Sequence, residues 1–322
     1  MHPKISVLMP VYNVEKYLPT CLQSLREQTF QDFEIVAIND GATDSSLSLL
    51  QAYAAQDKRM RIISQKNVGL ACTRNNLLDQ AKGEYFIFVD SDDWIRPDCL
   101  QLLYERAQQT GADVVQGWYQ EYNENTNTYR NCDDLYHQYH GPKPPKTCKD
   151  RFKAARSYLQ AWGRLVRLSI VQQHQLRCLP YKLAEDTSFS ILLYQYAPKI
   201  EFLEQYILFY RRSNSTSLST KVRKMAFDLF AQWCYVTKQC YQRHFKDASL
   251  YSCLLHLMVR HCMTNHFPWN EEEAKQMQEV ITVINDYAPL CSWPCRWRYQ
   301  LFGYMARHTH PQKLSFWARL LR

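Results

Sequence analysis

Short apolar segments alternate with segments of helical spacing over the first ninety residues of the chain. The apolar segments predict four strands, at 5–9, 33–38, 61–64 and 85–89. Apolar residues at helical spacing predict three helices between them, at 15–28, from Ser45 onward, and at 70–81. This alternation is typical of a mostly parallel sheet joined by right-handed crossovers, so the predicted fold class is α/β.

The pattern is less regular after residue 100. It predicts a helix at 100–110, a strand at 113–117, mixed strand and helix at 154–171, a helix at 188–196 and a strand at 206–210. Residues 120–150 are polar and contain Gly141-Pro142-Lys143-Pro144-Pro145, so we expect a loop there.

Helical spacing continues from Lys221 to the end of the chain, with a break expected at His266-Phe267-Pro268. We therefore expect an α/β domain over 1–220, divided into halves at 1–112 and 113–220. A helical C-terminal region is expected over 221–322.

The composition suits a folded protein with one large domain and a smaller one, since 46% of the 322 residues are hydrophobic. No leader pattern precedes the first strand, and twelve cysteines are scattered along the chain, which favours reduced thiols and a cytoplasmic location. No stretch reaches the roughly twenty apolar residues that cross a bilayer.

The positive charge is concentrated at the end of the chain. Of the formal net charge of +8, the 36 residues after Asp286 carry +6. If 313–322 is helical, five apolar residues share one face and oppose Arg319 and Arg322, which predicts contact with an anionic membrane surface. The alternative is that this face packs on the catalytic domain. No nucleic-acid motif accompanies the charge.

The apolar strand at 85–89 runs directly into Asp90-Ser91-Asp92-Asp93. The carboxyl end of a buried parallel strand opens into the crevice where such sheets bind ligands. Mg²⁺ and Mn²⁺ take oxygen ligands, which they often share with substrate phosphates. The segment thus points to a metal-bound nucleotide diphosphate, although the same residues are also ordinary turn and capping residues.

The chain resembles the inverting glycosyltransferases of the GT2 family over residues 4–218. Those enzymes have the GT-A fold, a mixed, mostly parallel sheet flanked by helices, and use nucleotide-activated sugars. Six motifs in the family's order carry the resemblance: Pro10-Val11-Tyr12-Asn13, Asn39-Asp40-Gly41-Ala42-Thr43-Asp44, Gln65-Lys66-Asn67-Val68-Gly69-Leu70, Thr73-Arg74-Asn75, Asp90-Ser91-Asp92-Asp93 and Glu185-Asp186.

The resemblance implies that residues 1–112 bind the donor and residues 113–220 the acceptor. It assigns donor binding to Pro10, Tyr12, Glu15, Asp40, Arg74, Asp90 and Asp92. Asp92 would ligate Mn²⁺ or Mg²⁺, and Arg74 would contact the diphosphate. A carboxylate at Asp40 can accept the uracil N3 hydrogen that cytosine lacks, which favours a UDP-sugar.

The remaining assignments concern the acceptor. An inverting transfer needs a base for the acceptor hydroxyl, and Asp186 matches the family's base. Asp93, Trp162 and Glu185 are expected on the acceptor side, and Arg211 and Arg212 on a phosphate-side loop.

Each group also has a structural alternative. Tyr12 could simply pack, Asp40 could cap a helix, and Arg74 could form a surface ion pair. Glu185-Asp186 could be helix N-terminal charge.

Together these features predict a peripherally membrane-bound transferase that adds one sugar from a UDP donor to a lipid-linked oligosaccharide. The resemblance is to the bacterial lipooligosaccharide or capsule type, and a β-1,3-linked GalNAc or Gal is our choice. A sugar nucleotidyltransferase would need a glycine-rich phosphate loop, which residues 10–18 lack. A catalytically silent membrane adaptor could dispense with Asp92 and Asp186.

Overall fold

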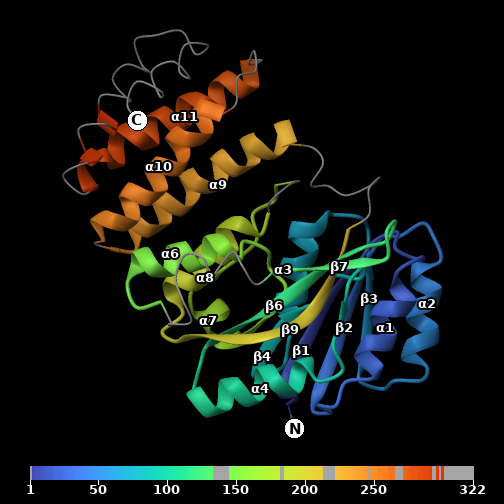
Figure 1. Ribbon diagram of the computed structural model, residues 1–322. Coiled ribbons are helices and arrows are strands. Elements are labelled where there is room, and N and C mark those ends of the chain that lie inside the picture. The colour runs from blue at the N-terminus through green and yellow to red at the C-terminus, as the bar shows by residue number, and fades with distance from the viewer. Residues whose placement is uncertain are drawn as a thin grey trace.

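The strands form one mixed sheet. The computed structural model describes residues 2–132, 145–181, 185–212, 222–245, 247–264, 271–291, 295–296 and 299–300. Its strands are β1 (Ile5–Val11), β2 (Phe33–Asp40), β3 (Met60–Gln65), β4 (Tyr85–Phe88), β5 (Trp94–Ile95), β6 (Val114–Asn123), β7 (Thr128–Asn131), β8 (Arg164–Arg167) and β9 (Ile200–Arg212). Within these residues the sheet order is β3-β2-β1-β4-β8-β6-β9-β5, and β7 pairs with β6 (Figure 1).

The helices lie on both sides of this sheet and in a group at one end (Figure 1). They are α1 (Leu18–Arg26), α2 (Ser46–Ala54), α3 (Leu70–Gln80), α4 (Cys99–Thr110), α6 (Cys148–Ser157), α7 (Leu168–Gln173), α8 (Thr187–Tyr196), α9 (Val222–Gln242), α10 (Ala248–Thr264) and α11 (Glu271–Tyr287), followed by the short helix η2 (Ala288–Leu290).

The first half is a parallel β-α-β series, as the sequence predicts. β1 pairs in parallel with β2 and β4, and β2 pairs in parallel with β3. Every residue of β1 is buried, because the strand lies at the centre of the sheet with helices on both faces. The prediction of an α/β fold is confirmed. The carboxyl ends of these four strands meet at one edge of the sheet.

The second half brings antiparallel strands to the same sheet. β8 is antiparallel to β4 and β6, while β6 and β9 run parallel. The residues Asp90–Asp93, here called the acidic turn, follow β4. The two-residue strand β5 comes directly after this turn and pairs Trp94 with Phe209 of β9. A strand this short has no periodicity, so the sequence did not predict it. Its pairing holds the end of β9 beside the acidic turn.

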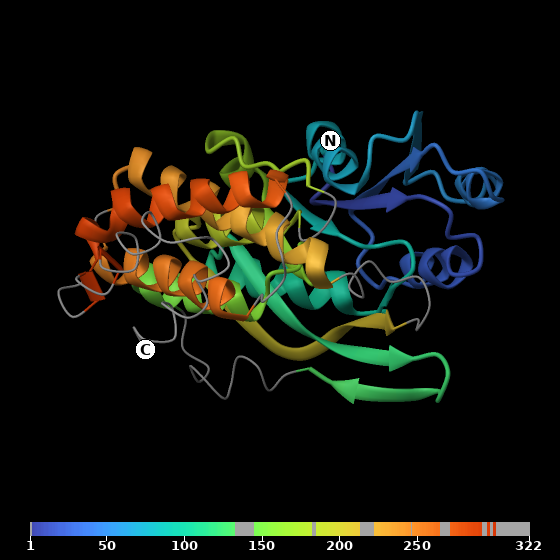
Figure 2. The same cartoon turned by 90° about the horizontal axis from the view of Figure 1, so that it is seen from above.

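The expected loop at 120–150 is partly wrong. β6 continues to Asn123 and forms a hairpin with β7, and β6 lies between β7 and the end of β9 (Figure 2). The polar composition concealed this strand, whose outer half is only half-buried. The helix α6 also begins inside the expected loop, at Cys148, where the Thr147 hydroxyl accepts the backbone N–H of Asp150 at 3.1 Å.

The C-terminal helices α9, α10 and α11 pack together and lie over α6 and α8 (Figures 1 and 2). The boundary expected near residue 220 falls between β9 and α9, and it stays a prediction. The expected break at 266–268 and the tail at 313–322 lie outside the described residues. In the part of the chain that is described, no helix combines the length and the apolar character needed to span a membrane.

Candidate active site

Two loops at the strand ends are joined by hydrogen bonds. Asn13, after β1, accepts the N–H of Thr43 at 2.8 Å. Glu15 accepts the N–H of Ser45 at 2.8 Å, just before α2. The carboxylate of Glu15 is therefore engaged at a helix N-terminus, where negative charge is favourable. Pro10 is buried, whereas the ring of Tyr12 is 49% exposed at the rim and can offer a face to a ligand.

Asp40 points into the protein, not outward. Its carboxylate is 3% exposed and accepts the N–H groups of Val68 at 2.9 Å and Gly69 at 3.0 Å, and the amide of Gln65 at 2.8 Å. These bonds fix the turn before α3, in which Gly69 has a φ of 86°. Asp40 therefore holds the backbone of the turn before α3 and does not cap α2, the helix that follows it in the chain. Its predicted contact with uracil stays a prediction.

Arg74 is the centre of a buried ionic cluster. The side chain projects from α3, is 2% exposed, and donates to both oxygens of Asp90, at 2.9 and 3.0 Å. A second nitrogen donates to Glu185, and Asp186 lies 3.9 Å away. Burial alone would lower the pKa of Arg74, but the surrounding carboxylates, led by Asp90, raise it above its usual range. The alternative of a surface ion pair is therefore wrong.

Glu185 and Asp186 lie at the amino end of α8 and face this cation. Burial raises the pKa of both carboxyl groups above the usual range, and Arg74 opposes the rise. Asp186 occupies the N-cap position, but its side chain makes no capping hydrogen bond. It accepts instead the backbone N–H of Ala161 at 3.0 Å. The Asp186 carboxylate thus makes no hydrogen bond that caps α8, and its role as the base stays a prediction.

The three acidic residues after β4 have different surroundings. Asp90 is paired with Arg74, whereas the half-buried carboxylate of Asp92 has no partner from another described residue. Burial, and next the charge of Asp90, raise the pKa of Asp92 to about 6. Asp93 is 1% exposed and accepts the N–H of Arg211 at 2.8 Å. Its expected place on the acceptor side is therefore wrong, because the buried carboxylate faces no solvent.

The surroundings of Asp92 fit a divalent ion that is shared with a substrate. Among the described residues no three His, Cys, Asp or Glu side chains converge as a metal site. Mg²⁺ and Mn²⁺ at phosphate sites commonly use one or two carboxylates and take their other ligands from phosphates and water. A cation beside Asp92 would also stabilise the anion that burial and Asp90 disfavour.

Trp162, which was expected on the acceptor side, is packed inside the protein. Its ring is 7% exposed, stacks on Tyr210 at 5.4 Å and meets the edge of Tyr119 at 4.8 Å. The segment nevertheless borders the candidate base, because the neighbouring residue Ala161 donates to Asp186. Trp162 thus packs beside the loop that contacts Asp186 and offers little of its ring to a ligand.

Three groups that support Asp186 were missed by sequence reasoning. Arg164, which is fully buried, donates to the carbonyls of Tyr158 and Gln160 and holds the loop that presents Ala161. The Ser190 hydroxyl donates to the carbonyl of Leu159 at 2.7 Å. Gln232 of α9 accepts the N–H of Ser188 at 2.8 Å. Arg164 belongs to the Trp162-Gly163-Arg164-Leu165 segment, a signal that could have indicated it, whereas Gln232 has none.

The two arginines at the end of β9 have different surroundings. Arg211 donates from Nε to the backbone carbonyl of Asp92 at 3.0 Å, and its guanidinium lies among aromatic rings. Arg212 is 59% exposed and pairs with Glu121 at 3.3 Å. The predicted phosphate-side loop therefore starts from one half-buried and one exposed arginine. The residues that follow, 213–221, lie outside the described part.

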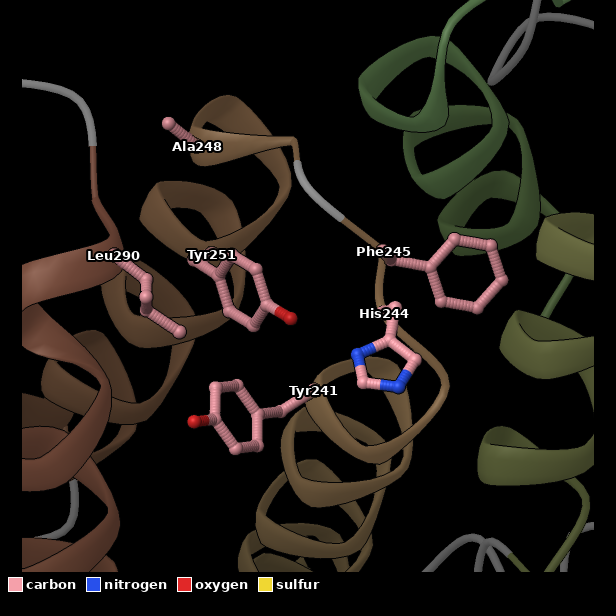
Figure 3. Close-up of a pocket in the computed structure, with 6 residues that line it drawn as sticks. All are labelled: Tyr241, His244, Phe245, Ala248, Tyr251 and Leu290. Carbon is pink, nitrogen blue, oxygen red and sulfur yellow. The ribbon is translucent and has the colours of Figure 1, made fainter.

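A cavity of about 290 Å³ lies among the C-terminal helices, apart from these carboxylates. Figure 3 shows its lining, which is aromatic and aliphatic: Tyr241, His244, Phe245, Ala248, Tyr251 and Leu290. No predicted site residue lines it, and it has no carboxylate. The cluster at the strand ends is therefore the candidate active site.

Known proteins resemble this chain in sequence and in fold. Residues 6–173 match the model of the family described as "Glycosyl transferase family 2". The chain is 32% identical over 232 residues to the EpsH protein of Bacillus subtilis (strain 168), which covers 70% of this chain and 65% of EpsH, slightly less than two thirds. It is 29% identical over 296 residues to "Uncharacterized glycosyltransferase EpsJ" of the same organism, covering 88% of this chain and 84% of EpsJ.

The structural likeness extends over nearly the whole chain. The crystal structure of S. aureus TarS 1-349 in complex with UDP-GlcNAc has a TM-score of 0.75 and 20% sequence identity, covering 98% of this chain and 92% of that chain. The mostly parallel sheet flanked by helices therefore has the GT-A fold, as predicted.

Proposed function

Because the chain belongs to glycosyl transferase family 2, we propose that it transfers one hexose or N-acetylhexosamine from a UDP-sugar to a hydroxyl of a lipid-linked glycan, with inversion at the anomeric carbon. Lipooligosaccharide or capsule biosynthesis is the proposed setting, and a β-1,3-linked GalNAc or Gal the proposed product linkage. The observation that carries the proposal is the buried cluster in which Arg74 joins Asp90, on the donor side, to Glu185 and Asp186.

Asp186 is the proposed general base. Its raised pKa and its position beside the loop at Ala161 suit a carboxylate that takes a proton from the attacking hydroxyl as the new bond forms. Glu185 pairs with Arg74. We propose that this ion pair keeps the positive charge of Arg74 next to the base. A cation there favours the ionised carboxylate, the form that can accept a proton.

The donor is proposed to lie across the carboxyl ends of β1, β2 and β4. The exposed ring of Tyr12 suits a nucleobase face, and a UDP-sugar agrees with the ligand of the TarS crystal. Asp92 would hold a Mn²⁺ or Mg²⁺ ion bound to the diphosphate. When bound, the ion would neutralise the negative charge that grows on the leaving UDP. The protein would contribute the Asp92 carboxylate and its fixed position.

The location and partners are proposed from the sequence. The basic, aromatic C-terminal tail would hold the enzyme at the anionic inner face of the cytoplasmic membrane, where a lipid-linked oligosaccharide is available. Membership of the family disfavours a nucleotidyltransferase. A silent adaptor would have no use for the buried carboxylates of Glu185 and Asp186, because burying such charges costs free energy.

The first test measures UDP release from a panel of UDP-sugars, with Mn²⁺ or with EDTA. We expect slow release from one or two donors, lost in EDTA and in Asp92→Asn. The control is Asp79→Asn, which changes an exposed aspartate that pairs with Arg177. If no donor yields UDP and UDP does not bind with Mn²⁺, the adaptor becomes the better account.

A further inference from the structure

Arg211 makes two hydrogen bonds to the acidic turn, one from its backbone and one from its side chain. Its backbone N–H donates to the buried carboxylate of Asp93 at 2.8 Å. Its Nε donates to the backbone carbonyl of Asp92 at 3.0 Å. One residue at the end of β9 therefore fixes both the residue proposed to bind the metal and its neighbour. The β5–β9 pairing of Trp94 with Phe209 makes these contacts possible, because it aligns the end of β9 with the turn.

Aromatic rings from three separate parts of the chain fix the direction of the Arg211 side chain. The guanidinium carbon lies 4.8 Å from the ring centre of Trp94, 4.9 Å from that of Tyr17 and 5.5 Å from that of Tyr122. These distances are within the range of cation–π attraction. Side chains of paired strand residues share a face, and Tyr122 pairs with Arg211. A planar guanidinium can lie against rings and still donate from Nε.

The next residue, Arg212, has the opposite orientation. Because side chains alternate along a strand, Arg212 points to the other face, where it pairs with Glu121 and is 59% exposed. Arg212 can therefore reach a ligand in solution. The Arg211 guanidinium already has the turn carbonyl and three rings as its surroundings.

We infer that Arg211 is a positioning residue for Asp92: it holds the Asp92 carboxylate where a divalent ion and a diphosphate can share it, and does not itself contact the diphosphate. This inference rests on the proposed function. It corrects the sequence prediction, which placed Arg211 with Arg212 among the phosphate contacts.

The test is calorimetric titration of the full chain with UDP, in Mn²⁺ and in EDTA. We expect Mn²⁺ to tighten UDP binding in the wild type. Arg211→Gln should lower that Mn²⁺-dependent gain at least tenfold, while UDP affinity in EDTA stays within twofold. Arg211→Lys keeps the charge but not the planar fork, and should lose most of the gain too. Arg177→Gln, which removes an exposed arginine elsewhere, should match the wild type.

A double-mutant cycle separates positioning from direct contact. If Arg211 acts through Asp92, Asp92→Asn with Arg211→Gln should bind UDP within twofold of Asp92→Asn alone, in Mn²⁺ and in EDTA. The inference would be overturned if the losses of UDP affinity from the two substitutions multiply in the double variant, or if Arg211→Gln loses as much UDP affinity in EDTA as in Mn²⁺. Either result would make Arg211 a diphosphate contact.

Three further outcomes are distinguishable. Near-ultraviolet circular dichroism would show whether Arg211→Gln unfolds. In that case Arg211→Lys and Tyr122→Leu, which removes one of the three rings around the guanidinium, test the inference by the same loss of the Mn²⁺-dependent gain in UDP affinity. Wild-type UDP binding that does not respond to Mn²⁺ would overturn the metal role in the proposed function, and this inference with it. If Mn²⁺ tightens UDP binding by the same factor in the wild type, Arg211→Gln and Arg211→Lys, this inference alone is overturned.

Discussion

The guanidinium of Arg74 and the carboxylate of Asp90 form an ion pair in which one nitrogen lies 2.9 and 3.0 Å from the two oxygens. The arginine is 2% exposed, so the pair is screened little by solvent. Its other terminal nitrogen binds Glu185. One cation thus connects the acid after β4 with the acids before α8, that is, the proposed donor side with the proposed base.

Replacing this cation should destabilise the protein in a pH-dependent way. Arg74→Met leaves buried carboxylates without their partner, which costs about 3 kcal/mol of unfolding free energy. Those carboxyls can escape by taking up protons, so the loss should be larger at pH 8 than at pH 5. Urea unfolding at the two pH values measures it. Arg177→Met is the exposed control, and a loss below about 1 kcal/mol at pH 8 would contradict a central role for Arg74.

Asp92 should show a trade between stability and ligand binding. Its folded pKa of about 6 exceeds its usual value, so the stability it contributes is complete below about pH 4 and is lost as pH rises through 6. Asp92→Asn should therefore stabilise the ligand-free protein by about 1–3 kcal/mol at pH 7.5, and by nearly nothing at pH 4. Urea unfolding in EDTA measures the difference. A destabilised variant at pH 7.5 would show that the burial is compensated by an unrecognised partner.

Asp186 should affect chemistry far more than donor binding. Asp186→Asn keeps an oxygen for the Ala161 N–H but cannot take a proton, so transfer should fall by about 10²–10⁴-fold. UDP affinity, measured separately by titration, should stay within twofold. The comparison variant is Glu185→Gln, which weakens the contact with Arg74 and should lower both properties moderately. Transfer within tenfold of the wild type in Asp186→Asn would exclude it as the base.

Gln232 should link the helical region to the site. Its side chain is fully buried and accepts the N–H of Ser188 near the start of α8. Gln232→Ala leaves that buried donor without its partner, which costs about 1–3 kcal/mol. Differential scanning calorimetry should show the lower melting temperature, and transfer should fall because α8 carries Asp186. Gln242→Ala, on the exposed end of the same helix, is the matched control.

The proposed membrane contact predicts a lipid-selective loss on truncation. Removal of residues 301–322 deletes four of the six basic residues that follow Asp286. With about 1 kcal/mol per basic residue at an anionic surface, cosedimentation with phosphatidylglycerol vesicles should drop steeply. Binding to neutral phosphatidylcholine vesicles serves as the control. Equal binding before and after truncation would favour the alternative that this tail packs on the catalytic domain.

The sequence by itself determined the first half of the fold and the place of the chemistry. The three buried strands β1, β2 and β4, with helices between them, leave a strong local pattern, because both faces of each strand must be apolar. The acidic turn after β4 and the pair at 185–186 were evident as charges directly beside apolar segments. The ordered motifs also sufficed to indicate the family.

Only the tertiary structure decided what each charged group touches. Arg74 and Glu185 are 111 residues apart, and nothing local in the sequence brings them together. Asp40 and Asp93 turned out to hold the backbone of neighbouring segments, and Trp162 to stack within the protein. Adjacent arginines acquired different surroundings because a strand sends successive side chains to opposite faces of the sheet. Burial and partnership are set by segments distant in sequence, so they emerge only when those segments pack.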